Sequence, residues 1–125
     1  MKLIIAGSRD LIVSQKFLQE ALGFFKLYLN EIVSGMASSG IDQCGLKYAK
    51  INSISVKEFP ADWGSWGKKA GPIKNQQMAQ YADTLLLIWT GVSPGSKNMK
   101  EEMTRLKKPI YEIILKKPDL PSKLF

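Results

Sequence analysis

The 125-residue chain contains no histidine and only one cysteine, Cys44. Without histidine it lacks the commonest general base near neutral pH and the commonest metal ligand. One cysteine forms no internal disulfide, and without histidine neither a structural zinc site nor a Ser-His or Cys-His nucleophile can be assembled. Any catalysis would therefore rest on carboxylates, lysines or a carboxylate-bound Mg²⁺.

Long hydrophobic runs are also missing, because no apolar stretch approaches the ~20 residues that a membrane-spanning helix needs. The chain opens on the strand-like stretch "KLIIAG" and not on the basic, apolar and small-residue segments of a signal peptide. A single cysteine is compatible with a reducing compartment. We therefore expect a cytoplasmic protein without membrane contact.

Acidic residues are fewer than basic ones: 11 Asp and Glu stand against 18 Lys and Arg, which gives a net charge of +7. This charge favours anionic partners, and nucleic acid, nucleotides and small phosphates all fit it. The basic residues do not interleave with aromatic ones outside the stretch around Trp63, and no known DNA-binding motif is present. Nucleic acid is therefore the less favoured partner.

Apolar runs alternate with helical patterns along the chain. The apolar runs predict strands, and the helical patterns predict helices at 14–30, 40–50, 71–81 and 99–108 between them. The strands are expected at 3–7, 31–35, 53–61, 83–91 and 109–115. This alternation predicts one α/β domain over residues 1–125, Rossmann-like, with a mainly parallel five-stranded sheet and helices on both faces. The tail at 116–125 is expected on the surface.

The helix predicted at 14–30 is the most apolar of the four. Ser14 is its expected N-cap, and its apolar stripe consists of Phe17, Ala21, Phe25 and Tyr28. The apolar richness of this segment would permit a homodimer.

Four loops rich in small residues follow the first four strands: "GSRD", "SGMASSG", "PADWGSWGKKAGP" and "TGVSPGS". Ligands of parallel sheets bind beyond the carboxyl ends of the strands, so we expect these loops to line one crevice. The second and fourth also open a helix, where glycine lets the backbone approach a ligand and free N–H groups attract phosphate. An ordinary turn, capped by Ser39 or Asp42, explains the second loop equally well. As a ligand contact, Asp42 would accept hydrogen bonds from sugar hydroxyls.

Trp63 and Trp66 stand in a polar, glycine-rich stretch outside any periodic apolar pattern. They could be core residues, but an aromatic residue in a polar loop is more often a lid or a stacking surface. Lys68 and Lys74 add positive charge nearby, and Asn75 would turn a donor and an acceptor toward the loop. Ring, cation and amide together suit the base, phosphate and sugar of a nucleotide.

The stretch "FPADWGSWGKKAGPIKNQQM" resembles the signature of the small, stand-alone YspA-like branch of the SLOG superfamily. That signature reads Pro-Ala-Asp-Trp and then Gly-Lys-x-Ala-Gly-Pro-x-Arg-Asn-x-x-Met. It is met here by Pro60, Ala61, Asp62, Trp63, Gly67, Lys68, Ala70, Gly71, Pro72, Asn75 and Met78. The stretches "AGSRD", "IVSGMASSGID" and "IWTGVSPGSKNM" are similar to other elements of the branch, so the resemblance runs from about Lys2 to Leu115.

The resemblance implies a Rossmann-like fold that binds nucleotides or nucleotide-derived signals, with ADP-ribose derivatives among the candidate ligands. Small members of the branch are found in bacteria and are common in phage genomes, so a phage-encoded protein would act in the host cytoplasm. Some SLOG relatives cleave nucleoside monophosphates at the N-glycosidic bond. These phosphoribohydrolases carry a glutamate where this chain has Met99, and a thioether can neither stabilise an oxocarbenium ion nor relay a proton.

Two further departures from the pattern concern positive charge. The second loop is one residue longer than usual and has Ser38 and Ser39 in place of a cation, which weakens the case for phosphate contacts from that loop. Lys74 stands where the signature has arginine, so a point charge replaces a bidentate donor.

The sequence therefore predicts a sensor or sequestering protein that binds a small anionic, nucleotide-derived ligand without catalysis and without a metal, and it identifies no certain cofactor. The alternatives are a nucleotide N-glycosidase or phosphohydrolase that uses Asp62 or Asp42, and a nucleic-acid-binding protein. The predicted ligand-binding residues are Gly7, Ser8, Arg9, Ser34, Gly35, Met36, Ala37, Ser38, Ser39, Asp42, Asp62, Trp63, Lys68, Gly71, Pro72, Lys74, Asn75, Met78, Trp89, Gly91, Ser93, Gly95, Ser96 and Lys97.

Overall fold

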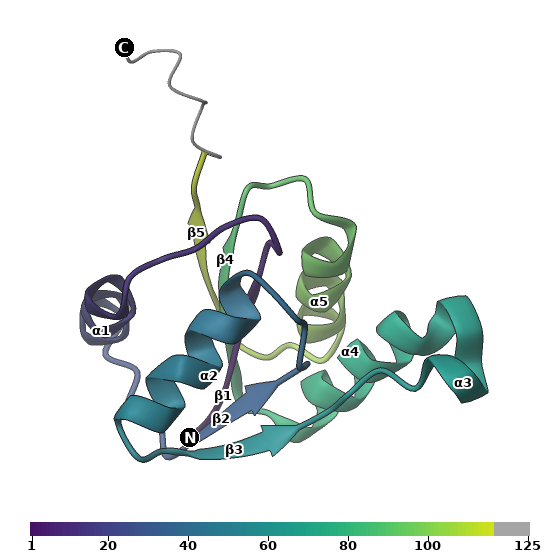
Figure 1. Cartoon of the computed structure of the whole chain (residues 1–125), viewed down its shortest axis with the longest axis horizontal. Coiled ribbons are helices and arrows are strands. Elements are labelled where there is room, and N and C mark those ends of the chain that lie inside the picture. Colours follow the sequence, from purple (N-terminus) through teal and green to yellow (C-terminus); the bar gives the residue numbers. More distant parts are fainter. Residues whose placement is uncertain (117–125) are drawn as a thin grey trace.

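The computed structural model describes residues 1–116, which form one five-stranded sheet with helices on both faces (Figure 1). All strand pairs are parallel, and the order across the sheet is β3-β2-β1-β4-β5. The strands are β1 (Lys2–Gly7), β2 (Glu31–Ser34), β3 (Ser55–Glu58), β4 (Thr84–Trp89) and β5 (Ile110–Ile114). The predicted α/β, Rossmann-like fold is confirmed, and the sheet is wholly parallel. Of the predicted surface tail, residues 117–125 lie outside the described residues.

Four helices cover the sheet in two pairs, with α1 and α2 on one face and α4 and α5 on the other (Figure 1). A short helix, α3, projects from the body of the domain, and the 3₁₀ helix η1 links it to α4. The helices are α1 (Gln15–Phe24), α2 (Ile41–Ile51), α3 (Trp63–Trp66), η1 (Gly67–Lys69), α4 (Ala70–Tyr81) and α5 (Pro94–Arg105). Within residues 1–116, no helix has both the length and the apolar character needed to cross a membrane.

The two faces of the sheet bury alternate residues of the same strands. Leu3 and Ile5 of β1 pack in the core beneath α1 and α2, whereas Ile4 packs in the core beneath α4 and α5. Every residue of β4 is buried, because β4 lies inside the sheet between β1 and β5. Successive side chains of a strand point to opposite faces of the sheet, so one apolar strand contributes residues to both cores.

The order of the strands creates a crevice at their carboxyl ends. The chain runs from β1 outward through β2 and β3, and then returns to add β4 and β5 on the other side of β1. Connections leaving the neighbours β1 and β4 therefore turn to opposite faces of the sheet, which opens the space where ligands bind in such folds. The two strands approach so closely at this end that a Cβ atom on Gly7 would lie 1.7 Å from the Ile88 carbonyl oxygen.

Helix α1 ends at Phe24, short of its predicted length. The Leu27 N–H donates to the Leu22 carbonyl, and Lys26 adopts a left-handed conformation with φ of 55°. These are the marks of a Schellman motif, which ends a helix. Tyr28 therefore does not continue the predicted apolar stripe and is 80% exposed.

Helix α5 begins at Pro94, well before Met99, the predicted start. Ser93 is its N-cap and Pro94 takes the first helical position, where the missing N–H has no acceptor to lose. Proline, glycine and serine disfavour helix interiors, so this first turn does not read as helical in the sequence. The prediction of Ser14 as the N-cap of α1 is confirmed, because its Oγ accepts a hydrogen bond from the Phe17 N–H.

Lys108 closes the C-terminal end of α4. Its Nζ donates to three backbone carbonyl oxygens at that end, those of Ala79, Gln80 and Ala82, at 2.7, 3.0 and 2.8 Å. The ammonium group thereby satisfies carbonyls that the helix leaves free and opposes the negative end of the helix dipole. We expect Lys108→Met, which keeps the apolar stem, to lower the free energy of unfolding by about 1–3 kcal/mol. Urea denaturation measures this, and equal stability of Lys108→Met and the exposed control Lys47→Met would contradict the role.

Candidate ligand-binding site

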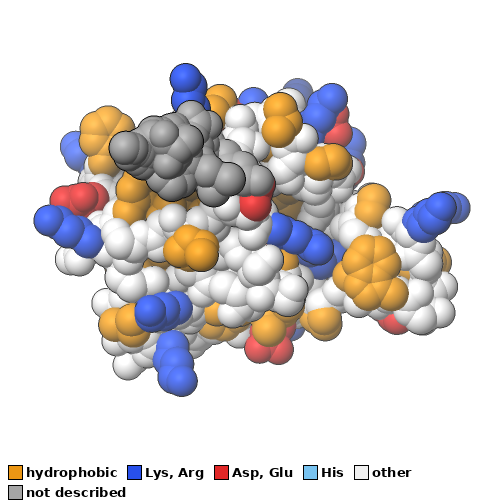
Figure 2. Space-filling model, turned by 45° about the horizontal axis from the view of Figure 1, so that its top comes forward, with side chains coloured by type: hydrophobic (Ala, Val, Ile, Leu, Met, Phe, Trp, Pro, Cys, Tyr) orange, Lys and Arg blue, Asp and Glu red, His pale blue; other side chains and the backbone are white. Residues whose placement is uncertain are grey.

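A cavity of about 690 Å³ lies at the carboxyl ends of the strands, within the usual size range of small-molecule sites. Residues that follow β1, β2, β3 and β4 line it together with side chains of α4 and α5. The prediction that the four loops meet at one edge of the sheet is thus confirmed. Figure 2 shows Lys and Arg side chains gathered in the hollow between the body of the domain and the segment that projects on the right.

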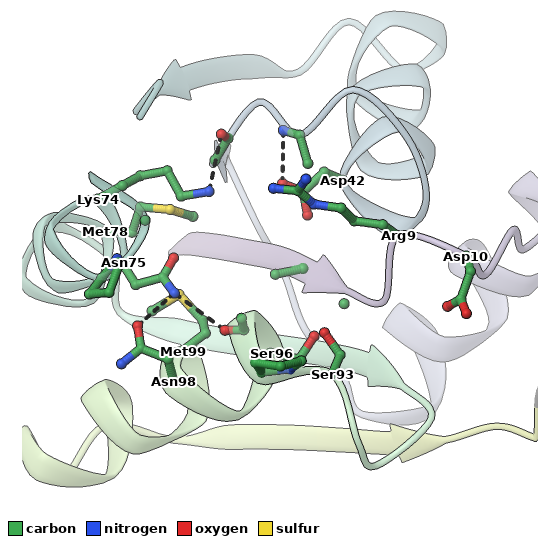
Figure 3. Close-up of a pocket in the computed structure, with 18 of the residues that line it drawn as sticks. Arg9, Asp10, Asp42, Lys74, Asn75, Met78, Ser93, Ser96, Asn98 and Met99 are labelled. Atoms are coloured by element: carbon green, nitrogen blue, oxygen red, sulfur yellow. Dashed lines mark hydrogen bonds between the residues drawn. The ribbon is translucent and has the colours of Figure 1, made fainter. Parts of the chain in front are cut away.

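Three charged side chains lie together on one side of the cavity: Arg9, Asp42 and Lys74 (Figure 3). Asp42 Oδ2 accepts a hydrogen bond of 3.2 Å from the Ala37 N–H. Lys74 Nζ donates to the Gly35 carbonyl oxygen at 3.4 Å. The carboxylate and the ammonium group therefore both hold the loop that follows β2, and they bring a residue of α4 against it.

Burial shifts the pKa values of both Asp42 and Lys74. Desolvation raises the pKa of the Asp42 carboxyl above its usual 3.8, because the Ala37 N–H, Lys74 and Arg9 offset only part of it. Desolvation likewise lowers the pKa of the Lys74 ammonium from 10.5, with the Asp42 charge opposing the shift and the Arg9 charge adding to it. An anionic group bound in the cavity would favour the charged form of Lys74.

The buried Asp42 carboxyl gives a pH test of this description. Its pKa is higher in the folded protein than in the unfolded chain, so the folded state holds the proton longer and stability falls as the pH rises through that interval. Asp42→Asn removes the titration, and its amide oxygen can still accept from the Ala37 N–H. We expect this variant to gain stability relative to the wild type as the pH rises from 3.8 toward neutrality. Denaturation at a series of pH values measures the difference, and a difference that shrinks would contradict the prediction.

The first turn of α5 borders another side of the cavity (Figure 3). The Gly95 and Ser96 N–H groups lie in that turn, where a helix supplies no acceptor, and the N-cap Ser93 makes no side-chain capping bond. Ser96 is only 4% exposed, and no described residue pairs with its Oγ. A buried hydroxyl without a partner therefore stands beside backbone donors at the positive end of a helix dipole.

Apolar side chains form a further part of the lining. Met78 of α4 and Met99 of α5 contribute their thioethers, and each residue is 1% exposed. Trp63 lines the rim and is 57% exposed, so it is not a core residue. The predicted polar loop around it is instead the short helix α3, which forms because Asp62 Oδ1 accepts from the Ser65 N–H at 3.1 Å and caps the helix.

Asn75 connects α4 to α5 beside the cavity. Its side-chain Nδ2 donates to the Gly95 carbonyl oxygen at 3.3 Å and to Asn98 Oδ1 at 2.8 Å. Asn75 is 8% exposed. The two bonds fix both the spacing of the helices and the orientation of the amide (Figure 3).

The structure brings most of the predicted binding residues to this cavity and leaves the others elsewhere. Those that line it are Gly7, Arg9, Gly35, Ala37, Asp42, Trp63, Gly71, Pro72, Lys74, Asn75, Met78, Ser93, Gly95 and Ser96. Those outside the lining are Ser8, Ser34, Met36, Ser38, Ser39, Asp62, Lys68, Trp89, Gly91 and Lys97.

Several residues of the second set support the loops instead of lining the cavity. Ser8 Oγ accepts from the Thr90 N–H and so ties the loop after β1 to the loop after β4. Ser34 Oγ accepts from the Met36 N–H. Ser39 Oγ donates to a carbonyl of the loop after β1. These polar groups are used within the protein, which the sequence pattern alone does not reveal.

Four other members of that set lie elsewhere in the structure. Trp89, Gly91 and Lys97 line a second cavity, of about 700 Å³, between α5 and β5. There the Trp89 indole N–H donates to Glu112 Oε2 at 2.6 Å. Lys68 is an exposed residue of η1.

Five lining residues are missing from the predicted ligand-binding set: Ala6, Asp10, Pro94, Asn98 and Met99. Asp10 and Pro94 nevertheless belong to loops that were expected to line the crevice. Asn98 and Met99 follow from where α5 begins, because residues three and four positions after Gly95 share its side of the helix. Starting the predicted helix at the "SPGS" turn would have placed both.

Within residues 1–116, no group of three or more Cys, His, Asp or Glu side chains could hold a metal ion. Protein-family models, curated proteins and solved structures were compared with the chain, and none of them matches it. The resemblance to the SLOG superfamily therefore stays a prediction.

Proposed function

We propose that the protein binds a nucleotide or a nucleotide-derived signalling molecule in the cavity at the carboxyl ends of the strands, as a sensor or by sequestering the ligand. The Ser96 hydroxyl carries the proposal. It is buried, it lines the cavity and it has no described partner, although buried polar groups are almost always hydrogen-bonded. A phosphate oxygen placed at the first turn of α5 would accept from this hydroxyl and from the adjacent backbone donors.

The other parts of the lining fit the rest of such a ligand. Lys74 and Arg9 supply positive charge for a second anionic group, and Asp42 supplies an acceptor for a sugar hydroxyl. The thioethers of Met78 and Met99 offer an apolar surface for a base, with the Trp63 ring at the rim. The volume of about 690 Å³ leaves room for a ligand larger than a mononucleotide, such as an ADP-ribose derivative.

The positions of the glutamates on α5 favour ligand binding without catalysis. Met99 lines the cavity where phosphoribohydrolase relatives would carry the catalytic glutamate. Glu101 lines the second cavity instead, and Glu102 pairs with Arg105 at 2.7 Å. The glutamates that follow Met99 on α5 are therefore not available to the bound ligand. Membership of the SLOG superfamily would be consistent with this use of the fold.

We expect no N-glycosidase activity above background. Incubation with AMP, followed by chromatography for free adenine, measures it. Asp42 and Asp10 are the carboxylates that line the cavity, so the matched controls are Asp42→Asn and Asp10→Asn. Adenine release that either substitution abolishes would overturn the expectation and favour the hydrolase alternative.

Native mass spectrometry of the purified protein tests the proposal without assuming a ligand. We expect an added mass that is lost on denaturation and that fragments to a nucleobase or a ribose phosphate. A second sample, refolded and then titrated with AMP and ADP-ribose, covers a ligand lost during purification. Absence of both a retained mass and any binding to these two probes would contradict the proposal.

A further inference from the structure

We infer that Asn75 is a fixed hydrogen-bond acceptor in the cavity, held by Asn98 and by the Gly95 carbonyl, and that it selects ligands with an N–H or O–H donor at that point. The inference rests on the proposed function and adds a rule of ligand choice to it. Neither the sequence signature nor the residue type contains this rule, because a free asparagine offers a donor and an acceptor equally.

The neighbours of Asn75 determine which way its amide points. The atom 3.3 Å from the Gly95 carbonyl oxygen must be the NH₂ group, because a backbone carbonyl only accepts hydrogen bonds. The same NH₂ group lies 2.8 Å from Asn98, so the Asn98 atom that faces it must be the amide oxygen. A flipped Asn75 would set its amide oxygen against the Gly95 carbonyl oxygen, so that two acceptors would face each other. The orientation therefore follows from the chemistry of the partners.

This arrangement uses both N–H bonds of Asn75 within the protein. Its Oδ1 points away from Gly95 and Asn98 (Figure 3), and no described residue donates to it. Asn75 is 8% exposed and lines the cavity, so the ligand is the available donor. A ligand atom that only accepts would leave this oxygen unpaired on binding, which costs affinity.

Two parts of a nucleotide could supply the donor: an exocyclic amino group of the base or a sugar hydroxyl. The apolar thioethers of Met78 and Met99 line the same cavity and suit a base, whereas Asp42 offers a sugar its own acceptor. Removing each donor from one parent probe separates these sources. Purine riboside 5′-monophosphate lacks the amino group of AMP, and the 2′-deoxy and 3′-deoxy forms of AMP each lack one hydroxyl.

The test compares affinities as ratios, measured by calorimetry against AMP. In the wild-type protein, one of the three analogues should bind about three- to ten-fold more weakly than AMP. In Asn75→Leu that ratio should fall to about one. Asn98→Asp keeps an acceptor for the Asn75 NH₂ group and should keep the ratio, whereas Asn98→Leu should lower it. Added charge or lost stability changes the affinities of AMP and of its analogue alike, so their ratio stays the same. A merely structural role of Asn75 or Asn98 would therefore leave the ratio unchanged.

Two outcomes would overturn the inference. Ratios that stay at the wild-type value in Asn75→Leu would show that the acceptor selects nothing, and equal ratios in Asn98→Asp and Asn98→Leu would show that Asn98 does not position it. If Asn75→Leu does not fold, the Asn98 pair decides alone. Failure of the wild-type protein to bind AMP or any analogue would overturn the inference, and if no retained mass and no ADP-ribose binding are found either, it would overturn the proposed function as well. In that case NMR of the free protein would still test the orientation of the amide. Slow hydrogen exchange of the Asn75 side-chain protons would support it, because both N–H groups are bonded within the protein, and fast exchange would contradict it.

Discussion

Lys74→Met is expected to weaken AMP binding by about ten- to a hundred-fold, because hydrogen bonds to charged groups contribute roughly 1.5–3 kcal/mol each. Lys74 lines the cavity beside Asp42 and reaches it from α4. Burial lowers its pKa in the free protein because water solvates the ammonium group poorly there. An anionic ligand would therefore pair with a poorly solvated cation. Methionine keeps the apolar stem and removes the charge together with the hydrogen bond to the Gly35 carbonyl oxygen. Isothermal titration calorimetry measures the loss.

Lys68→Met is the matched control for this prediction. Lys68 belongs to the same stretch of sequence and has the same charge, but it is exposed on η1 and does not line the cavity. We expect its substitution to change affinity less than two-fold at physiological salt, where surface charges are screened. Equal losses from both variants would mean that net charge, and not the cavity, attracts the ligand.

The affinity should also depend on pH through Lys74. A bound anion raises the lowered pKa of this ammonium toward its usual value, so binding takes up a proton at alkaline pH. Affinity should therefore fall as the pH rises toward 10.5, and Lys74→Met should remove that dependence.

Trp63→Ala is expected to weaken nucleotide binding by about ten-fold while leaving the stability of the free protein nearly unchanged. Stacking of a base on an aromatic ring contributes roughly 1–3 kcal/mol, and 1.4 kcal/mol corresponds to a factor of about ten. The ring is 57% exposed at the rim of the cavity, so its removal leaves no hole in a packed core. Fluorescence quenching on titration and thermal unfolding of the free protein measure the two effects.

Trp66→Ala separates stacking from a general effect on the projecting segment. Trp66 lies on the same short helix and is 53% exposed, but it does not line the cavity. It should keep wild-type affinity. A loss of about 3–5 kcal/mol of stability in Trp63→Ala, the usual cost of removing a core aromatic, with unchanged affinity, would contradict the assignment of Trp63 to the rim.

The sequence contained most of the fold because its strands and helices differ in period. Short, continuously apolar runs such as "LIIAG" and "LLLIW" stand out against the helical spacing between them, and alternation of the two dictates a parallel sheet. The ends of helices were less predictable. Lys26 ends α1 by adopting a left-handed conformation that lysine rarely takes, and no residue type signals this.

The candidate site was predictable where backbone geometry dictates it and unpredictable where side chains choose between partners. Parallel strands bring their following loops together, which placed Gly35, Gly95 and Ser96 correctly at the cavity. Ser8 bonds to the loop after β4, and Lys97 lies on the far side of α5. The same small or polar residue types serve ligand binding and loop support, so only the structure distinguishes them.

A titration of the ¹⁵N-labelled protein with AMP, followed by NMR, shows whether a nucleotide binds in the cavity at the carboxyl ends of the strands. We expect saturable shifts of the Gly95 and Ser96 amides, at the first turn of α5, and of the Asn75 side-chain amide and the Trp63 indole N–H. The second cavity, with the Trp89 indole N–H bonded to Glu112, should change little. Shifts confined to the second cavity, or shifts spread over exposed lysines, would contradict binding in the first cavity if the first turn of α5 were unaffected.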